Sequence, residues 1–162
     1  VVDGAGFLLN NEMDDFSAKP GVPNVYGLIG NTANAIEPGK RMLSSMSPTI
    51  VETPEGKLFM VVGSPGGSTI ITTIAQIIMN VVDFSMDIED AVETPRFHHQ
   101  WLPDIIQFEE QSFSSETIQA LEERGHSIML SGSIGEANCI QVVGGYMFGA
   151  ADSRRNSSAI GY

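Results

Sequence analysis

Cysteine, basic residues and long hydrophobic runs are all scarce in this sequence. The single cysteine, Cys139, excludes a disulfide bond within the chain. Only 8 Lys and Arg residues stand against 20 Asp and Glu residues, which gives a formal net charge of −12. Nucleic acids and anionic membrane surfaces repel such a charge, so we expect no nucleic-acid partner and no membrane contact from this chain.

No segment has the length and apolarity of a membrane span or a signal peptide. The longest apolar stretch, residues 70–82, contains Thr72, Thr73, Gln76 and Asn80, and it is too short and too polar to cross a bilayer. The N-terminus has no initiating methionine, no basic segment and no apolar signal core. We therefore expect a processed chain or a fragment.

The composition that is present favours a folded domain. Hydrophobic residues make up 42% of the chain and charged residues 17%, which excludes an acidic disordered tail. The length fits one domain over residues 1–162, and a chain of this size buries enough surface for a hydrophobic core.

Hydrophobic periodicity and turn residues predict an α+β chain. Helices are expected at residues 68–84, 88–93 and 114–124, and strands at 1–11, 48–51, 58–62, 105–108, 127–130, 138–143 and 146–150. A Gly-, Pro- and Asn-rich stretch at 17–40 predicts a long loop. The helix at 68–84 is largely apolar, so we expect it deep in the core, with Ser68 or Thr69 as its N-cap. Two strand groups flank two central helices, which predicts layers of sheet and helix.

The first candidate site is the acidic segment 10–15, with the sequence Asn-Asn-Glu-Met-Asp-Asp. Its carboxylates, Glu12, Asp14 and Asp15, repel one another unless a cation lies among them, and the ammonium group of a ligand would serve. The alternative is a solvated turn capped by Asn and Asp side chains.

The second candidate is the pair Ser44 and Ser45, which precedes a predicted strand. Two hydroxyl groups in this position can donate hydrogen bonds to a carboxylate. A nucleophilic role is disfavoured because no lysine follows three residues after either serine. Serine-stabilised turns at the entry to a strand are the alternative.

The third candidate is the glycine-rich corner at 63–67, with the sequence Gly-Ser-Pro-Gly-Gly, which opens the central helix. Gly66 and Gly67 let a substrate oxygen approach the backbone closely, where free N–H groups at a helix start favour a phosphate or a developing oxyanion. The lysine of a Walker A loop is missing. A tight strand-to-helix turn is the alternative.

The histidines and the cysteine predict structural roles. His98 and His99 are adjacent, so in a strand they point to opposite faces and do not easily bind one metal ion. No other His or Cys lies at ligand spacing. We expect no metal and no cofactor, and we expect Cys139 to be an inert buried thiol.

These segments, taken in order, carry a family resemblance. The strings are Asn-Asn-Glu-Met-Asp-Asp-Phe, Lys-Pro-Gly-Val-Pro-Asn, Ser-Ser-Met-Ser-Pro-Thr-Ile, Gly-Ser-Pro-Gly-Gly-Ser and Pro-Arg-Phe-His-His-Gln-Trp-Leu-Pro-Asp. From residue 6 to residue 162 the chain resembles the small subunit of γ-glutamyltransferases, also called γ-glutamyltranspeptidases or glutathione hydrolases. The resemblance implies the αββα four-layer sandwich of N-terminal-nucleophile hydrolases, of which this chain would form part.

The resemblance also implies an activity. A precursor cleaves itself into a large and a small subunit, and the new N-terminal threonine attacks γ-glutamyl amides such as glutathione. The γ-glutamyl-enzyme then passes its acyl group to water or to an amino acid or peptide amine. Members of the family imply a periplasmic or extracellular location.

The resemblance assigns roles to three pairs of residues. Glu12 and Asp15 would hold the α-amino group of the substrate, Ser44 and Ser45 its α-carboxylate, and Gly66 and Gly67 would form the oxyanion hole. Residues 20–31 would form a lid over the site, with Tyr26 as the gating aromatic.

The nucleophile is not expected in this chain. Only nine residues precede Asn10, and no threonine occurs before Thr32. We therefore expect a binding half-site that is inactive alone and that pairs with the large subunit of the same precursor. The alternative is a non-catalytic module that binds a glutamate-like ligand or acts in assembly.

We predict that the isolated chain self-associates or is only marginally stable, because a sheet without its N-terminal strand exposes an edge. Thermal unfolding followed by circular dichroism, together with analytical ultracentrifugation, measures both properties. A monomer with a cooperative transition well above about 65 °C would contradict this prediction.

Overall fold

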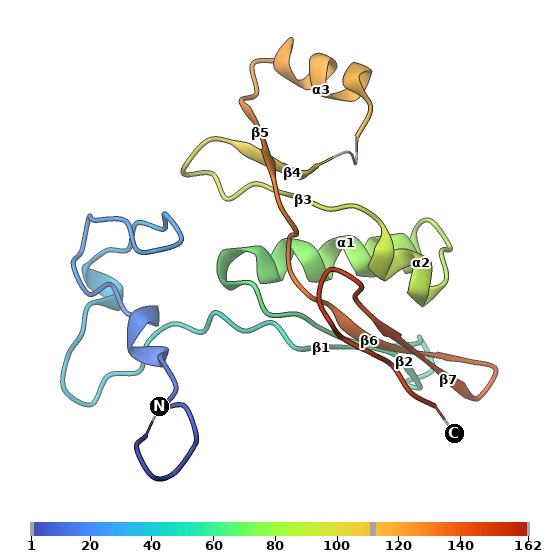
Figure 1. The fold of residues 1–162 in the computed structure, drawn as a ribbon, viewed down its shortest axis with the longest axis horizontal. Helices are drawn as coiled ribbons and strands as arrows, with labels where there is room; N and C mark the ends of the chain where they lie inside the picture. The colour runs from blue at the N-terminus through green and yellow to red at the C-terminus, as the bar shows by residue number, and fades with distance from the viewer. Residues whose placement is uncertain (1, 111–112, 162) are drawn as a thin grey trace. The chain divides into compact units, whose positions relative to one another are not determined.

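The computed structural model describes residues 2–110 and 113–161, and the chain forms two compact units, Val1–Ser45 and Met46–Tyr162 (Figure 1). The single domain over residues 1–162 stays a prediction. In the first unit the regular elements are two short 3-10 helices, η1 (Glu12–Asp15) and η2 (Thr32–Asn34). The loop predicted at 17–40 is confirmed apart from η2 and two isolated β-bridges.

The strand predicted at 1–11 is wrong for residues 2–11, and residue 1 lies outside the described residues. The chain turns back instead, and the N–H of Val2 donates to the carbonyl of Phe7 at 2.9 Å. Gly4 and Gly6 have φ values of 79° and 71°, a left-handed conformation that interrupts an extended strand.

The described residues of the second unit form two sheets and three α-helices. The four-stranded antiparallel sheet has the order β1-β2-β6-β7 and consists of β1 (Thr49–Glu52), β2 (Leu58–Gly63), β6 (Asn138–Val143) and β7 (Tyr146–Ala151). The three-stranded sheet has the order β3-β4-β5 and consists of β3 (Phe97–His98), β4 (Ile106–Glu109) and β5 (Ile128–Ser131). The helices are α1 (Ile70–Val82), preceded by the 3-10 turn η3 (Gly67–Thr69), α2 (Ile88–Glu93) and α3 (Ser115–Glu122).

Most predicted elements of this unit are confirmed within one or two residues. The hairpin β6–β7 turns at Gly144 and Gly145, whose φ values of 59° and 89° suit glycine. The N-cap of α3 is Ser114, whose side chain accepts from the N–H of Thr117 at 3.2 Å. None of the helices in the described ranges is long and apolar enough to span a membrane.

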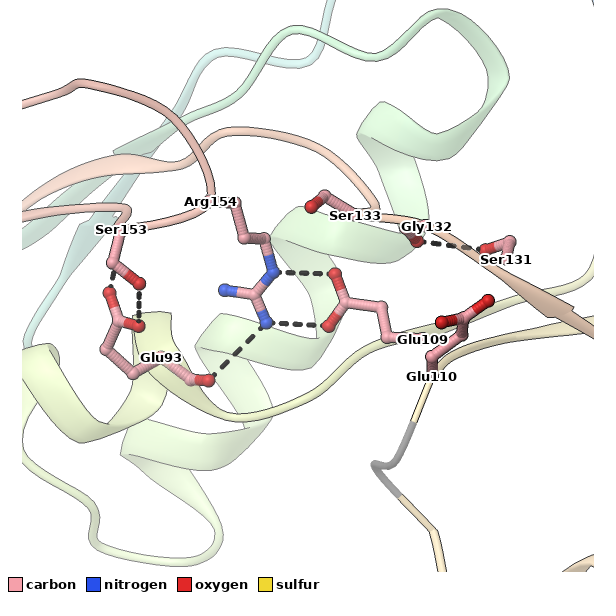
Figure 2. Close-up of a pocket in the computed structure, with 8 residues that line it drawn as sticks. All are labelled: Glu93, Glu109, Glu110, Ser131, Gly132, Ser133, Ser153 and Arg154. Atoms are coloured by element: carbon pink, nitrogen blue, oxygen red, sulfur yellow. Dashed lines mark hydrogen bonds and ion pairs between the residues drawn. The ribbon is translucent and has the colours of Figure 1, made fainter.

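A charged network lies in the second unit and consists of the buried residues Arg96, Glu109 and Asp152 and the partly buried Arg154. Arg96 is 1% exposed and Asp152 0%, and their side chains pair at 2.7 Å. Arg154 donates from Nε and Nη2 to the two carboxylate oxygens of Glu109, at 2.6 and 2.7 Å (Figure 2). This bidentate geometry is the strongest form of a charge-assisted hydrogen bond. The network therefore ties β4 to the segment that follows β7.

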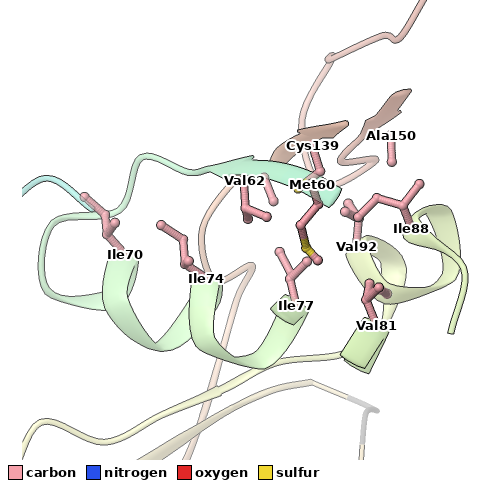
Figure 3. Packing of buried hydrophobic residues seen from close by; sticks show 12 residues of the cluster. Met60, Val62, Ile70, Ile74, Ile77, Val81, Ile88, Val92, Cys139 and Ala150 are labelled. Atoms are coloured by element: carbon pink, nitrogen blue, oxygen red, sulfur yellow. The ribbon is translucent and has the colours of Figure 1, made fainter. Parts of the chain in front are cut away.

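The hydrophobic core lies between α1, α2 and the four-stranded sheet (Figure 3). Its main contributors are Ile70, Ile74, Ile77 and Val81 of α1, Ile88, Ala91 and Val92 of α2, and Met60, Val62, Cys139 and Ala150 of the sheet. The four α1 positions recur at three- and four-residue spacing, so one face of the helix enters the core. Burying an isoleucine or valine side chain contributes roughly 1.5–3 kcal/mol.

The expectation that α1 lies deep in the core on all but its polar face is wrong. Ile71, Met79 and Val82 are exposed. The polar residues face neighbouring structure instead: the side-chain amide of Gln76 donates to the carbonyl of Phe97 at 2.8 Å and accepts from its N–H at 3.1 Å. Amide side chains thus complete the hydrogen bonding of the short strand β3.

The expectations for the N-cap of α1 and for Cys139 of β6 have opposite outcomes. No side chain caps α1 at Thr69, because its hydroxyl donates back to the carbonyl of Gly66 at 3.0 Å. Cys139 is buried as expected, and burial raises the pKa of its thiol to about 11, which keeps it protonated and unreactive near neutral pH.

Helices α1 and α2 cover one face of the four-stranded sheet, and α1 also contacts β3 of the smaller sheet (Figure 1). This arrangement confirms the predicted layers of sheet and helix. On the opposite face of the four-stranded sheet, Ile50, Ile140 and Met147 are 67%, 41% and 75% exposed. These three side chains of that face are therefore exposed in the described part of this unit, whereas Ala159 lies close to the same face at Gly149.

The carboxylates of the charged network have shifted pKa values. Burial by itself raises the pKa of Glu109, but hydrogen bonds from Arg154 and from two backbone N–H groups outweigh it, and the net shift is downward. Burial also opposes the ionised form of Asp152, and hydrogen bonds from the N–H groups of Ala137 and Arg154 and from Arg96 again lower its pKa.

We predict that the free energy of unfolding falls as the pH drops below about 4. Folding lowers the pKa of both carboxyl groups. Their contribution to the free energy of unfolding is therefore fully present above the pKa they have in the unfolded chain, and it is lost as the pH falls through their lower pKa in the folded state. Urea titrations between pH 7 and pH 3 measure this dependence. The variant Glu109→Gln should have a lower free energy of unfolding at pH 7, and this energy should fall less between pH 7 and pH 3. The same pH dependence in both proteins would contradict the lowered pKa of Glu109.

Candidate functional site

The acidic segment forms one 3-10 turn, η1, which follows the irregular segment at residues 2–11. Glu12 begins the turn, is exposed, and donates its backbone N–H to the side chain of Asn10 at 3.3 Å. Asp15 ends the turn and is half-buried, because the next residue, Phe16, is buried in the first unit. The turn therefore displays Glu12 to solvent and holds Asp15 against the protein.

Asp15 and Ser45 meet in the structure, although 30 positions separate them in the sequence. The hydroxyl of Ser45 lies 2.9 Å from each carboxylate oxygen of Asp15. Ser44, the neighbouring residue, is exposed. The structure therefore brings one carboxylate of the acidic turn and one hydroxyl of the serine pair together.

Asn34 also lies at this candidate site, although no sequence motif includes it. Its side chain donates to the carbonyl of Asp15 at 2.7 Å and accepts from the N–H of Leu43 at 3.0 Å. A single asparagine in a loop rich in Asn, Gly and Pro does not stand out by pattern. Only the folded chain reveals that it contacts both binding segments.

The segment at 20–31 folds as a loop with its own hydrogen bonds. The N–H of Gly21 donates to the carbonyl of Gly30 at 2.8 Å and closes the base of the loop. The side chain of Asn24 accepts from the N–H groups of Tyr26 and Leu28 at 2.9 and 3.0 Å, which shapes the tip. Tyr26 is half-exposed at that tip. Its role as a gating aromatic stays a prediction.

Gly66 and Gly67 lie in the second unit, between β2 and α1. Gly66 has a φ of 145° and Gly67 a φ of 56°, which only glycine adopts without strain. A Cβ on Gly66 would clash with the Oγ1 atom of Thr69. Because η3 begins at Gly67, the first N–H groups of this turn have no acceptor within the helix.

A second loop supports this corner. The hydroxyl of Ser64 accepts from the N–H of Glu136 at 3.0 Å and donates to the carbonyl of Pro65 at 2.7 Å. Gly135 is packed so closely that a Cβ there would lie 2.8 Å from the Ser64 hydroxyl and 2.9 Å from that of Thr73. Gly135 is one of 17 glycines in the chain, and no sequence motif marks it.

The histidines have structural partners. His98 is buried, with Nδ1 at 2.8 Å from the Thr72 hydroxyl and Nε2 at 2.9 Å from the side-chain oxygen of Gln100. His99 pairs with Asp104 at 3.0 Å. Among residues 2–110 and 113–161, no three His, Cys, Asp or Glu side chains are grouped as metal ligands would be.

A shallow hollow of about 380 Å³ lies beside Arg154 (Figure 2). Its lining residues are Glu93, Glu109, Glu110, Ser131, Gly132, Ser133, Ser153 and Arg154, and none of them is a predicted site residue. Arg154 and Glu109 are bonded to each other there, and Glu93 accepts from both the N–H and the hydroxyl of Ser153. The hollow is therefore part of the structural network.

Comparisons with known proteins agree on one family. A sequence model described as gamma-glutamyltranspeptidase matches residues 1–162. The chain is 52% identical over 155 residues to the glutathione hydrolase proenzyme of Escherichia coli (strain K12), which covers 95% of this chain and 26% of that protein. It is 50% identical over 157 residues to the glutathione hydrolase proenzyme of Pseudomonas aeruginosa, which covers 95% of this chain and 28% of that protein.

Solved structures give the same result. A mutant of gamma-glutamyltranspeptidase from Helicobacter pylori matches with a TM-score of 0.91 and 53% identity, covering 96% of this chain and 85% of that chain. Gamma-glutamyltranspeptidase from Pseudomonas nitroreducens, complexed with L-DON, matches with a TM-score of 0.91 and 47% identity, covering 100% and 85%. Cephalosporin acylase from Bacillus halodurans, at 24% identity and a TM-score of 0.69, shows the fold alone.

The fold is that of an α+β N-terminal-nucleophile hydrolase, of whose αββα sandwich this chain forms part. The chain belongs to the gamma-glutamyltranspeptidase family. It spans about a quarter of the length of the two curated relatives described above.

We predict that Gly135→Ala lowers the free energy of unfolding by about 1–3 kcal/mol, because the new Cβ meets two hydroxyl groups and the φ of +73° strains alanine. The matched control is Gly132→Ala, at a nearby position with open space around the Cβ and an ordinary φ. That control should stay within about 0.5 kcal/mol of the parent chain. Urea denaturation compares the two, and equal stabilities would contradict the close packing of Gly135.

Proposed function

We propose that this chain supplies the donor-binding residues and the oxyanion hole of an enzyme that cleaves γ-glutamyl amides such as glutathione. The observation that carries the proposal is the contact between Asp15 and Ser45, at 2.9 Å. It joins an acidic and a hydroxyl group from two segments that were each predicted to bind one charge of the same substrate. Family membership supports the same activity.

In this proposal the α-ammonium group of the γ-glutamyl donor binds Asp15 and Glu12, and its α-carboxylate binds Ser44 and Ser45. The hydroxyl of Ser45 has one proton, and in the free protein it points to Asp15. When the substrate binds, its ammonium group pairs with the carboxylate of Asp15 in place of the Ser45 hydroxyl. The Ser45 hydroxyl can then donate its hydrogen bond to the substrate carboxylate. Two charge-assisted contacts then replace one hydrogen bond.

The reaction step uses the corner at 63–67. The N-terminal threonine of the mature small subunit attacks the γ-carbonyl carbon, and its α-amine takes the hydroxyl proton. The N–H groups of Gly66 and Gly67 stabilise the oxyanion, which is typically worth about 2.7–4 kcal/mol for each donor. The C–N bond breaks, the leaving amine takes the proton, and water or an amino acid or peptide amine then attacks the γ-glutamyl ester.

The partner in this proposal is the large subunit of the same precursor, bound as a heterodimer. The exposed apolar face of the four-stranded sheet, with Ile50, Ile140 and Met147, supports it. An αββα sandwich packs a second sheet against that face. We also propose that the lid at 20–31 covers the bound donor, with Tyr26 at its tip, and that the enzyme acts in the periplasm or outside the cell.

We predict that Asp15→Asn in the full proenzyme lowers kcat/KM for a chromogenic γ-glutamyl anilide by thirtyfold or more, since losing a paired charge costs about 2–5 kcal/mol. The matched control is Asp14→Asn, which removes a charge from the same turn at an exposed position. It should keep kcat/KM within about threefold.

A second substrate tests the assigned charge. A glutaryl anilide lacks the ammonium group, so Asp15→Asn should lower kcat/KM less for this substrate than for the γ-glutamyl anilide. The ratio of the two kcat/KM values should therefore be smaller in the variant than in the wild type. Equal losses on both substrates would contradict the role of Asp15. A wild-type proenzyme that hydrolyses neither substrate, while the isolated chain binds L-glutamate by calorimetry, would favour the non-catalytic module instead.

A further inference from the structure

We propose that Asn34 is a positioning residue for the γ-glutamyl donor, which holds Asp15 and Ser45 in place without touching the substrate. The inference rests on the proposed function, because it concerns how the same site is held together. It assigns a role to a residue that no sequence motif indicated.

The contacts of the Asn34 side chain cross from one binding segment to the other. Its Nδ2 atom donates to the carbonyl of Asp15 at 2.7 Å, at the end of the acidic turn. Its Oδ1 atom accepts from the N–H of Leu43 at 3.0 Å, two residues before Ser45. One planar amide therefore fixes the backbones from which both ligand-binding side chains project.

The backbone of Asn34 is itself held. Its carbonyl accepts from the N–H of Ser17 at 2.9 Å, and Ser17 forms a parallel bridge with Ala35. The helix η2, which ends at Asn34, is capped by the side chain of Asn31 at 2.8 Å from the N–H of Ala33. These hydrogen bonds fix the backbone of Asn34. Its side-chain amide is therefore held in place, and its two hydrogen bonds hold the backbone at Asp15 and at Leu43.

Asparagine is the side chain that this geometry needs. Aspartate keeps an acceptor for the N–H of Leu43 but has no donor for the carbonyl of Asp15. Alanine has neither, and it leaves a carbonyl and an N–H without their partners. The loop at 20–31 lies in sequence between the acidic turn and Asn34. The hydrogen bonds of the Asn34 side chain link the backbone near Asp15 directly to the backbone near Ser45, and no residue of that loop takes part in them.

The variant Asn34→Ala in the full proenzyme should raise KM for a γ-glutamyl anilide, and the inhibition constant of L-glutamate, by about tenfold each, the effect of losing one or two hydrogen bonds. The turnover number kcat should stay within about threefold, because the oxyanion corner and the nucleophile lie on other segments. The matched control is Asn80→Ala, which removes the side-chain hydrogen bond from Asn80 in α1 to the carbonyl of Ala91 in α2. It should lower the Tm without raising either constant.

The outcomes separate the two claims. A wild-type proenzyme that neither cleaves the anilide nor is inhibited by L-glutamate overturns the proposed function. An active wild type combined with an unchanged KM and inhibition constant in Asn34→Ala overturns only the inference, as does a change no larger than in Asn80→Ala. Should Asn34→Ala fail to fold, the nearly isosteric Asn34→Asp must show the same rise in both constants, and wild-type values for it would overturn the inference.

Discussion

The charged network is the constraint on which the second unit depends, because it holds the loop at 134–137 from both sides. Glu109 and Arg96 bind the backbone N–H and carbonyl of Ile134 at 2.7 and 2.8 Å. The carboxylate of Asp152 binds the N–H of Ala137 at 2.8 Å. Between these points lie Gly135 and the residue that bonds the Ser64 hydroxyl. Buried ionic groups thus set the position of a loop that supports the glycine corner.

The first unit is organised by different forces. Its buried side chains include Phe16 and Ser17, and hydrogen bonds between side chains and backbone supply much of the remaining order. Such bonds typically contribute about 0.5–1.5 kcal/mol each, so a unit held in this way moves more easily than a packed core. In the proposed function, a lid needs that mobility, whereas an oxyanion hole needs rigid support.

Local patterns predicted the elements whose stability is local. The cap at Ser114, the turn at Gly144 and the apolar spacing of α1 each depend on neighbouring residues, and each is found in the structure. The strand expected at residues 2–11 is absent for a local reason, because Gly4 and Gly6 adopt left-handed conformations there. Strand β3 was not predicted because it depends on distant contacts: its two residues pair with β4 and with the side-chain amide of Gln76.

The sequence by itself determined the chemistry available to this protein: an acidic turn, a serine pair and a glycine corner, in an order that identifies the family. Charge and hydroxyl content are properties of residues, so they can be read without coordinates. Only the tertiary structure decided that Asp15 meets Ser45, that Asn34 holds both segments, and that Gly135 supports the corner. These contacts join residues far apart in the chain, and the distance between such residues is fixed by the whole fold rather than by their spacing.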